Sequence, residues 1–384
     1  MPNEVLKYYA TDKEVFDVLA SSRQRLSESA LLDIARSRGI FYSPRESREI
    51  LASNISLLPH DYESLRELLG QSENPNRAEK VTSITLNKKL SAAELKQVAQ
   101  AFAESAPKDE KVISHSEGPD KYVVQVKYSE IDYGKTRLLQ RRNREADIRF
   151  VVEGDRTTIR MPANAKAREI ANQLKNGLDA LQDDKIQTEI IEIFDLTADD
   201  RTAFFTSLIT KMSGYELQDV TNVRVQSGGR HSEIVGSEVD EDERDEQDKA
   251  IESQRMLAVV ENVALHGQVL LASSEYQLLR KKGFYITSIT WKSKQTTTPY
   301  NVLEFDAGFE EPKDGRGFRY NVRGLYRNRD GEFTKTLRGL SEDHKESVFP
   351  LIERAALNVL AELRKKNTPP SAPVNVAKAQ EEKP

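Results

Sequence analysis

The sequence predicts an α+β fold of two or three domains, and three observations support this. The chain has 384 residues, which is too long for a single ordinary hydrophobic core and suits two or three domains. Segments with helical periodicity and short alternating strands are interleaved, without the regular order of a parallel sheet. Charged residues make up 31%, yet 13 Phe and 13 Tyr remain, a composition typical of folded cores joined by polar segments.

Residues 1–70 are expected to form a helical domain. The apolar residues of DKEVFDVLASSRQRL recur at helical spacing, and a second helix, SESALLDIARSR, should end at Gly39. A third helix is expected to begin with Ser43 as N-cap, Pro44 in the first helical position and Glu46 in the third. HDYESLRELLG then closes the domain as a fourth helix.

Residues 79–226 follow a polar linker and are expected to form a mixed α+β middle region of one unit or two. The predicted strands are VTSITLN, KYVVQVKY, DIRFVVEG, RTTIRM, IQTEIIEIF and YELQDVTNVRVQ. The predicted helices are SAAELKQVAQAFAES, NAKAREIANQLKNGLDAL and TADDRTAFFTSLITKM. No internal repeat of fixed period is apparent in the sequence.

Residues 227–249 are predicted to be an acidic linker, leading into a long helix, DKAIESQRMLAVVENVALHG. Residues 250–367 should form a C-terminal α+β domain with a three-stranded antiparallel meander and flanking helices. Its strands are GFYITSITWKSK, YNVLEFDAGF and GFRYNVRGLYRNR, and Pro350 is expected to kink or split the closing helix. Residues 368–384 read as a disordered tail.

Composition excludes several classes of chemistry. The chain has no cysteine, which removes disulfides, thiolate catalysis and sulfur-ligated zinc. Its five histidines are scattered, and no phosphate-binding loop, dinucleotide fingerprint or nucleophile elbow occurs, so we expect no cofactor. No signal peptide and no stretch of about 18 apolar residues is present, so we expect a soluble, cytoplasmic protein without membrane contact.

The segment 29–53 offers a first candidate surface. LLDIARSRGI followed by YSPRESREILA resembles the helix-extended-loop-helix modules of the SAP-like and Rho-N-like families. That resemblance implies nucleic-acid binding through the second helix and the loop before it, with Arg36, Arg38, Arg45 and Arg48 meeting phosphates. The alternative is a small helical docking domain with ordinary solvated arginines.

The last strand of the meander offers a second candidate surface. Alternation places Phe318, Tyr320, Val322 and Tyr326 on one face. The opposite face should carry Asn321 and Leu325 together with four arginines, Arg319, Arg323, Arg327 and Arg329. Such a row could follow a phosphate backbone or an acidic protein. Alternatively, Glu304 and Asp306 of the neighbouring strand pair with part of the row.

Two further charged runs complete the candidate surfaces. YGKTRLLQRRNRE is basic, with Arg137, Arg141 and Arg142, and is either a nucleic-acid contact or a solvated loop or short helix. The acidic run 240–248 matches no calcium loop and is expected to be a charged linker, with docking on a basic patch as a further hypothesis.

Two enzymatic alternatives stay open. Arg338 and His344 have the spacing found in HEPN-type ribonucleases, but those enzymes are helical bundles, and Ser341 as N-cap with His344 in the first turn is the favoured interpretation. A metal-dependent nuclease could assemble carboxylates from separate strands, such as Asp147, Glu153 and Glu192.

Because three basic clusters occur in a chain of net charge −5, we predict a non-enzymatic accessory or regulatory protein of bacterial or phage type. Its expected partner is a DNA or RNA backbone. The first alternative is a scaffold or adaptor for a larger protein, and the second is the metal-dependent nuclease. Oligomeric state is left open.

Overall fold

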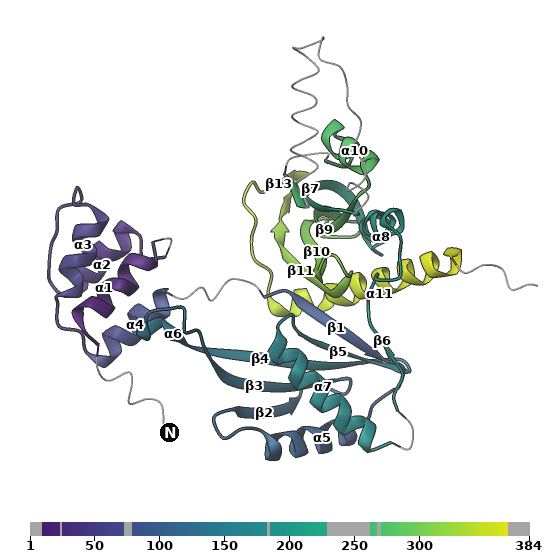
Figure 1. Ribbon diagram of the computed structural model, residues 1–384, viewed down its shortest axis with the longest axis horizontal. Coiled ribbons are helices and arrows are strands. Elements are labelled where there is room, and N and C mark those ends of the chain that lie inside the picture. The colour runs from purple at the N-terminus through teal and green to yellow at the C-terminus, as the bar shows by residue number, and fades with distance from the viewer. Residues whose placement is uncertain are drawn as a thin grey trace, which may run out of the picture. The chain divides into compact units, whose positions relative to one another are not determined.

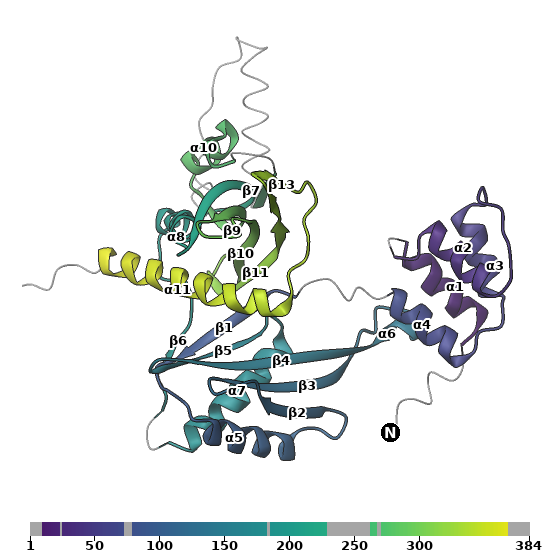
Figure 2. The ribbon, with the colours of Figure 1, turned by 180° about the vertical axis from the view of Figure 1, so that it is seen from behind.

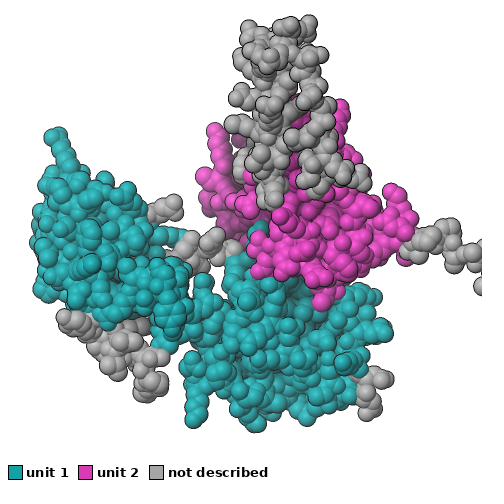
Figure 3. Space-filling view, viewed as in Figure 1, with its two compact units in different colours: residues 1–189 teal, residues 190–384 magenta. Residues whose placement is uncertain are grey.

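The computed structural model describes residues 10–23, 25–72, 79–182, 185–228, 262–266 and 270–367 (Figure 1). Helices and antiparallel strands alternate along it, which confirms the predicted α+β class. The chain divides into two compact units, residues 1–189 and 190–384, coloured separately in Figure 3. This boundary falls inside the predicted middle region 79–226. The acidic run 240–248 and the tail 368–384 lie outside the described residues.

Unit 1 begins with four helices, α1 (Asp12–Ser21), α2 (Glu28–Ser37), α3 (Arg48–Ser56) and α4 (Tyr62–Ser72). Local capping sets the starts of three of them, because the hydroxyls of Thr11, Ser27 and Ser47 accept backbone N–H groups of the first turn. The prediction that the third helix begins at Pro44 is wrong. Residues 44–46 form a turn, and α3 starts only after Ser47.

The remainder of unit 1 is an antiparallel sheet with two long helices. Its strands are β1 (Val81–Leu86), β2 (Lys111–Ser116), β3 (Lys121–Ile131), β4 (Arg141–Glu153), β5 (Arg156–Pro162) and β6 (Thr188–Glu189), in the order β2-β3-β4-β5-β1-β6. Helices α5 (Ala92–Ser105) and α7 (Ala165–Ala180) pack together over one face (Figure 1). β2 was not anticipated, and the predicted strand IQTEIIEIF is reduced to Thr188–Glu189.

Unit 2 repeats this plan with different insertions. It contains α8 (Ala198–Thr210), β7 (Tyr215–Ser227), β8 (Asn262–His266), a 3₁₀ turn (Leu270–Ala272), α10 (Ser274–Lys281), β9 (Phe284–Gln295), β10 (Val302–Glu311), β11 (Arg316–Tyr326), a small hairpin of β12 (Asn328–Arg329) and β13 (Glu332–Phe333), and α11 (Glu342–Asn367). The sheet order is β11-β10-β9-β7-β8. The predicted meander is thus β9-β10-β11, extended by β7 and β8.

Two predictions for unit 2 need correction. Residues 262–266 were assigned to a long helix, but they form β8, which pairs with β7 from Asn222 to Gln226. The closing helix was expected to kink or split at Pro350, and the split does not occur, because one helix runs from Glu342 to Asn367 with the proline inside.

An aromatic cluster holds the helices of unit 2 on one face of its sheet. Phe204 and Phe205 of α8 meet Phe309 of β10 with ring centroids 6.0 and 5.8 Å apart, and Phe204 meets Phe318 of β11 at 5.9 Å. Tyr320 then packs edge-on against Phe349 of α11 at 5.5 Å. Each such pair adds about 0.5–1.5 kcal/mol to the burial of its rings.

The two units share one sequence of elements. In each, a helix is followed by a four-stranded antiparallel meander and a second helix, and the two helices pack against one another on one face of the sheet. The matching elements are α5-β2-β3-β4-β5-α7 and α8-β7-β9-β10-β11-α11. No repeat of fixed period appears in the sequence because the insertions differ. Residues 132–140 interrupt the meander of unit 1, and residues 228–283 that of unit 2.

Candidate nucleic-acid interface

The predicted arginine row of β11 is interrupted by a β-bulge. Glu304 of β10 pairs with Gly324, but the next residue, Phe305, pairs with Val322, so Arg323 is the extra residue. Before the bulge the side chains alternate as expected, with Phe318 and the residues at 320 and 322 buried. Beyond the bulge the alternation is reversed, so that even-numbered side chains lie on the face that odd-numbered side chains occupy before it.

The reversal moves Tyr326 away from the core face where it was predicted. Its hydroxyl donates to Glu304 Oε2 at 3.1 Å, and Lys292 Nζ lies 4.7 Å from the centre of its ring. Arg323 Nη1 pairs with Glu304 Oε1 at 2.6 Å, so the cross-strand neutralisation foreseen as the alternative does occur at this position. Arg327 and Arg329 lie beyond β11 and are exposed, Arg329 in the β12–β13 hairpin.

The remaining arginine, Arg319, belongs to a row that runs across the sheet rather than along the strand. In register across β7, β9, β10 and β11 lie Arg224, Ser288, Gly308 and Arg319. Because cross-strand partners share a face, this whole row lies on one face of the sheet. That face is opposite to the one on which Phe309 contacts helix α8. We call this side of the sheet the polar face of unit 2, defined by this row and the next.

The next row of the polar face is Asn222, Thr290, Asp306 and Asn321. Thr290 and Asn321 are only 4% and 7% exposed. Asn222 Oδ1 is shielded from solvent and has no hydrogen-bond partner among the described residues, and the same holds for Arg319 Nε in the first row. Shielded polar atoms of this kind are normally satisfied, so both are exceptions on this face.

The close approach of β9 and β10 shapes the first row. A Cβ added at Gly308 would lie 2.7 Å from Ser288 Cβ and 3.0 Å from Thr287 O. Glycine is therefore required, and between Arg224 and Arg319 the row carries only one small side chain. The two arginines are separated by three strand spacings, about 14 Å.

The four arginines of the helical domain do not form one surface. Arg48 is buried, and its guanidinium donates from Nε to Leu26 O at 3.1 Å and from Nη2 to Leu19 O. It therefore ties the α1–α2 connection to α3 and is not placed to contact phosphate, contrary to the prediction. The two backbone carbonyls accept the hydrogen bonds that the guanidinium of Arg48 would otherwise make with water.

The other three arginines of that set lie nearer the surface. Arg38 donates to Pro59 O at 3.0 Å and contacts His60 Nδ1 at 3.0 Å, while Arg36 pairs with Asp33 at 2.9 Å. Arg45 is exposed in the turn before α3. Only Arg36 and Arg45 of this set therefore present their guanidinium groups outward.

The basic run after β3 is not a solvated loop. Its first arginine, Arg137, opens the short helix α6 (Arg137–Gln140) and donates from Nη2 to Glu14 Oε2 at 2.8 Å. Leu138 and Leu139 pack against the core of the helical bundle, and both ribbon views place α6 beside α4 (Figures 1 and 2). The run thus attaches the bundle to the sheet of unit 1. Arg141 and Arg142 begin β4, opposite Ile131 and Glu130, and are half-buried.

Unit 1 also carries a cross-strand arginine pair on the face away from its helices. Arg149 of β4 is in register with Arg160 of β5, whereas their neighbours Ile148 and Ile159 belong to the core beneath α5 and α7. Arg160 is 3% exposed, and Arg149 contacts Asp147 at 3.4 Å. The two units therefore place arginines on equivalent faces of their sheets.

Residues that the sequence suggested for an enzymatic site make hydrogen bonds that are common at helix starts and between neighbouring strands. His344 Nδ1 lies 2.9 Å from Ser341 Oγ in the first turn of α11, and Arg338 bridges to Leu325 through its backbone. Asp147 accepts from Gln125 at 3.1 Å. Within the described parts of the chain, no three His, Asp or Glu side chains gather as a metal site.

Sequence reasoning missed Arg224, Ser288, Gly308 and Asn222. The alternation of DVTNVRVQ already placed Asn222 and Arg224 on one face of their strand, because Val223 and Val225 occupy the other. What the pattern did not contain was the register that aligns Arg224 with Arg319, two residues 95 positions apart in the chain.

None of the described helices is both long and apolar enough to cross a bilayer. No protein-family model and no curated protein matches this chain.

Proposed function

We propose that this protein associates with the backbone of a nucleic acid in a non-enzymatic, accessory role, through the polar face of unit 2. One observation carries the proposal. Arg224 and Arg319 stand in one cross-strand row, opposite the helices, and neither has an ion pair among the described residues. Guanidinium groups match phosphate oxygens in geometry and charge.

The shape of the row favours an extended partner. Ser288 and Gly308 leave little side-chain bulk between the two arginines, which lie about 14 Å apart. A backbone lying across the strands would meet a guanidinium at each end of this row. Contacts of this kind position a nucleic acid without reading its sequence.

The second row supplies hydrogen bonds rather than charge. Thr290 and Asn321 are buried, so the half-buried Asn222 is the residue of this row whose amide suits sugar and phosphate oxygens. Asp306 and Glu304 oppose phosphate, although Glu304 is already neutralised by Arg323. We therefore expect moderate affinity with a strong dependence on salt.

The test is a titration of the full chain with a labelled DNA duplex, its single strand and an RNA of the same sequence, followed by anisotropy across a range of salt. Arg224→Gln and Arg319→Gln should each weaken binding about tenfold and reduce the slope of log K against log salt by about 1. Arg66→Gln is the matched control, since that guanidinium pairs with Glu63 in α4 of unit 1 and is not part of the polar face, and it should leave the slope unchanged. Absence of binding at low salt, or equal slopes in all variants, would overturn the proposal.

A second function, docking to a larger protein, is supported by exposed apolar side chains of the helical domain. Three apolar side chains of the helical domain are strongly exposed, namely Phe41 at 80%, Leu57 at 65% and Ile50 at 47%. Exposed large apolar groups mark protein-interaction sites when they gather into a patch. Co-purification with a partner that is lost in Phe41→Ser but retained in Arg224→Glu would favour docking over nucleic-acid association.

A further inference from the structure

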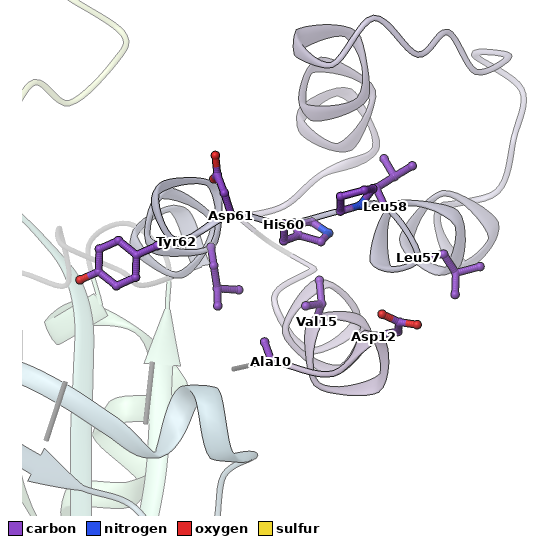
Figure 4. A pocket seen from close by; sticks show the side chains of 10 residues that line it. Ala10, Asp12, Val15, Leu57, Leu58, His60, Asp61 and Tyr62 are labelled. Carbon is purple, nitrogen blue, oxygen red and sulfur yellow. The ribbon is translucent and has the colours of Figure 1, made fainter. Parts of the chain in front are cut away.

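The helical bundle of unit 1 contains a cavity of about 320 Å³ between α1 and the connection from α3 to α4 (Figure 4). Val15 and Leu65 line its interior and are only 2% and 5% exposed. Leu57, Leu58 and Pro59 line the side formed by the connection. The volume is at the lower end of the range for ligand sites, which suits one or two side chains.

Hydrogen bonds hold the wall formed by the connection in place. Arg38 donates to Pro59 O at 3.0 Å and contacts His60 Nδ1 at 3.0 Å. On the other side of the ring, His60 Nε2 lies 2.9 Å from Ile55 O. The ring thus joins the C-terminal end of α2 to the last turn of α3. A partner would therefore enter a cavity that is already formed, without the cost of ordering a loop.

Two carboxylates stand at this cavity, Asp12 in the first turn of α1 and Asp61 before α4. Both are exposed, and neither has an ion pair among the described residues. Hydrogen bonds from Ser64 lower the pKa of Asp61, so this group stays charged. Burial lowers the pKa of His60, so its ring is neutral near pH 7, while the charge of Arg38, which also lowers the pKa of Asp61, offsets that carboxylate in part.

We propose that this cavity binds a short segment of a partner protein in which an aliphatic side chain stands beside a lysine or arginine. The aliphatic group fills the space over Val15, Leu58 and Leu65, and a cation beside it meets either Asp12 on one side of the cavity or Asp61 on the other (Figure 4). A nucleic acid is disfavoured here, because its phosphates would face the two carboxylates. The site does not rest on nucleic-acid association, and either activity can fail while the other stands.

The test uses labelled peptides of stated composition with the full chain. The first probe is a Gly-Lys-Leu-Lys-Gly peptide, with Gly-Glu-Leu-Glu-Gly and Gly-Lys-Ser-Lys-Gly as charge and size controls. Binding is followed by methyl NMR shifts of Val15, Leu58 and Leu65. Saturable shifts at these three positions with the first peptide, and at least about fivefold weaker binding of both others, are expected.

Variants assign the interaction to the cavity. Asp12→Asn combined with Asp61→Asn removes both charges and keeps an amide oxygen to cap α4, and should weaken binding of the lysine peptide about five- to tenfold. Asp17→Asn on α1, which does not line the cavity, is the matched control and should bind normally.

Preference for the lysine peptide that disappears in the double variant supports the site. Equal binding of lysine and glutamate peptides, shifts confined to other methyl groups, or no binding at millimolar peptide overturns it. If the double variant loses helical circular dichroism, the comparison of the three peptides on the unaltered chain still decides the question.

Discussion

Arg137 and Glu14, 123 residues apart in the chain, form a two-pronged ion pair between α6 and α1, with Nη2 2.8 Å from Oε2 and Nε donating to the other carboxylate oxygen. The Glu14 side chain is 18% exposed and that of Arg137 34%. Bidentate guanidinium–carboxylate pairs are the strong members of their class. The pair accompanies the packing of Leu138 and Leu139 against the bundle core.

Arg137→Gln should loosen the attachment of the bundle by about 1–3 kcal/mol, because it leaves a half-enclosed carboxylate without its cation. Hydrogen exchange of α1 and α6 should accelerate while α5 and α7 stay protected. Arg66→Gln is the matched control, since its pair with Glu63 at 2.6 Å is exposed on both sides and contributes less than about 0.5 kcal/mol. Equal protection of α1 in both variants would contradict the assignment.

The same pair predicts a pH dependence. The hydrogen bond from Arg137 lowers the pKa of Glu14 from 4.5 to about 2. A depressed pKa contributes stability that is complete above about pH 4.5 and is lost as the pH falls towards 2. The difference in unfolding free energy between the unaltered chain and Arg137→Gln should therefore be constant near neutrality and shrink below pH 4.5. Urea unfolding at several pH values measures it, and a constant difference down to pH 2 would contradict the prediction.

Arg48→Met should destabilise the bundle by about 2–4 kcal/mol, because the carbonyls of Leu19 and Leu26 lose their charged donor. Arg45→Met, three residues earlier and exposed, should stay within about 0.5 kcal/mol. Thermal unfolding by circular dichroism distinguishes the two. Similar melting of both variants would show that Arg48 does not stabilise the bundle through the carbonyls of Leu19 and Leu26.

Gly308→Ala should cost about 1–3 kcal/mol, since the new Cβ would lie 2.7 Å from Ser288 Cβ. Adding Ser288→Gly removes that clash and should restore part of the loss, although Thr287 O at 3.0 Å still opposes the methyl group. Denaturant unfolding of the single and double variants gives their coupling energy. Strict additivity would contradict the close approach of β9 and β10.

Local signals identified most helices because their causes lie within a few residues of sequence. Ser91 with Glu94 caps α5 reciprocally, and Asn164 caps α7 through Ala167 N at 2.7 Å. The start of α3 was misplaced because Ser43 and Ser47 both match the N-cap pattern, and packing of Leu51 and Ile55 selects between them. β2 was missed because its side chains are mostly exposed and lack alternation.

The sequence by itself determined the α+β class, the apolar stripes of the helices, the caps of most helices other than α3, and the three strands of the C-terminal meander. Tertiary structure alone decided that a bulge at Arg323 sends Tyr326 to the other face, that Arg48 faces inward, and that Arg224 stands in one row with Arg319. Helix caps and periodicity depend on residues three or four positions apart, whereas strand register depends on pairings across long loops. A shift of one residue in such a pairing moves every later side chain to the opposite face of the sheet.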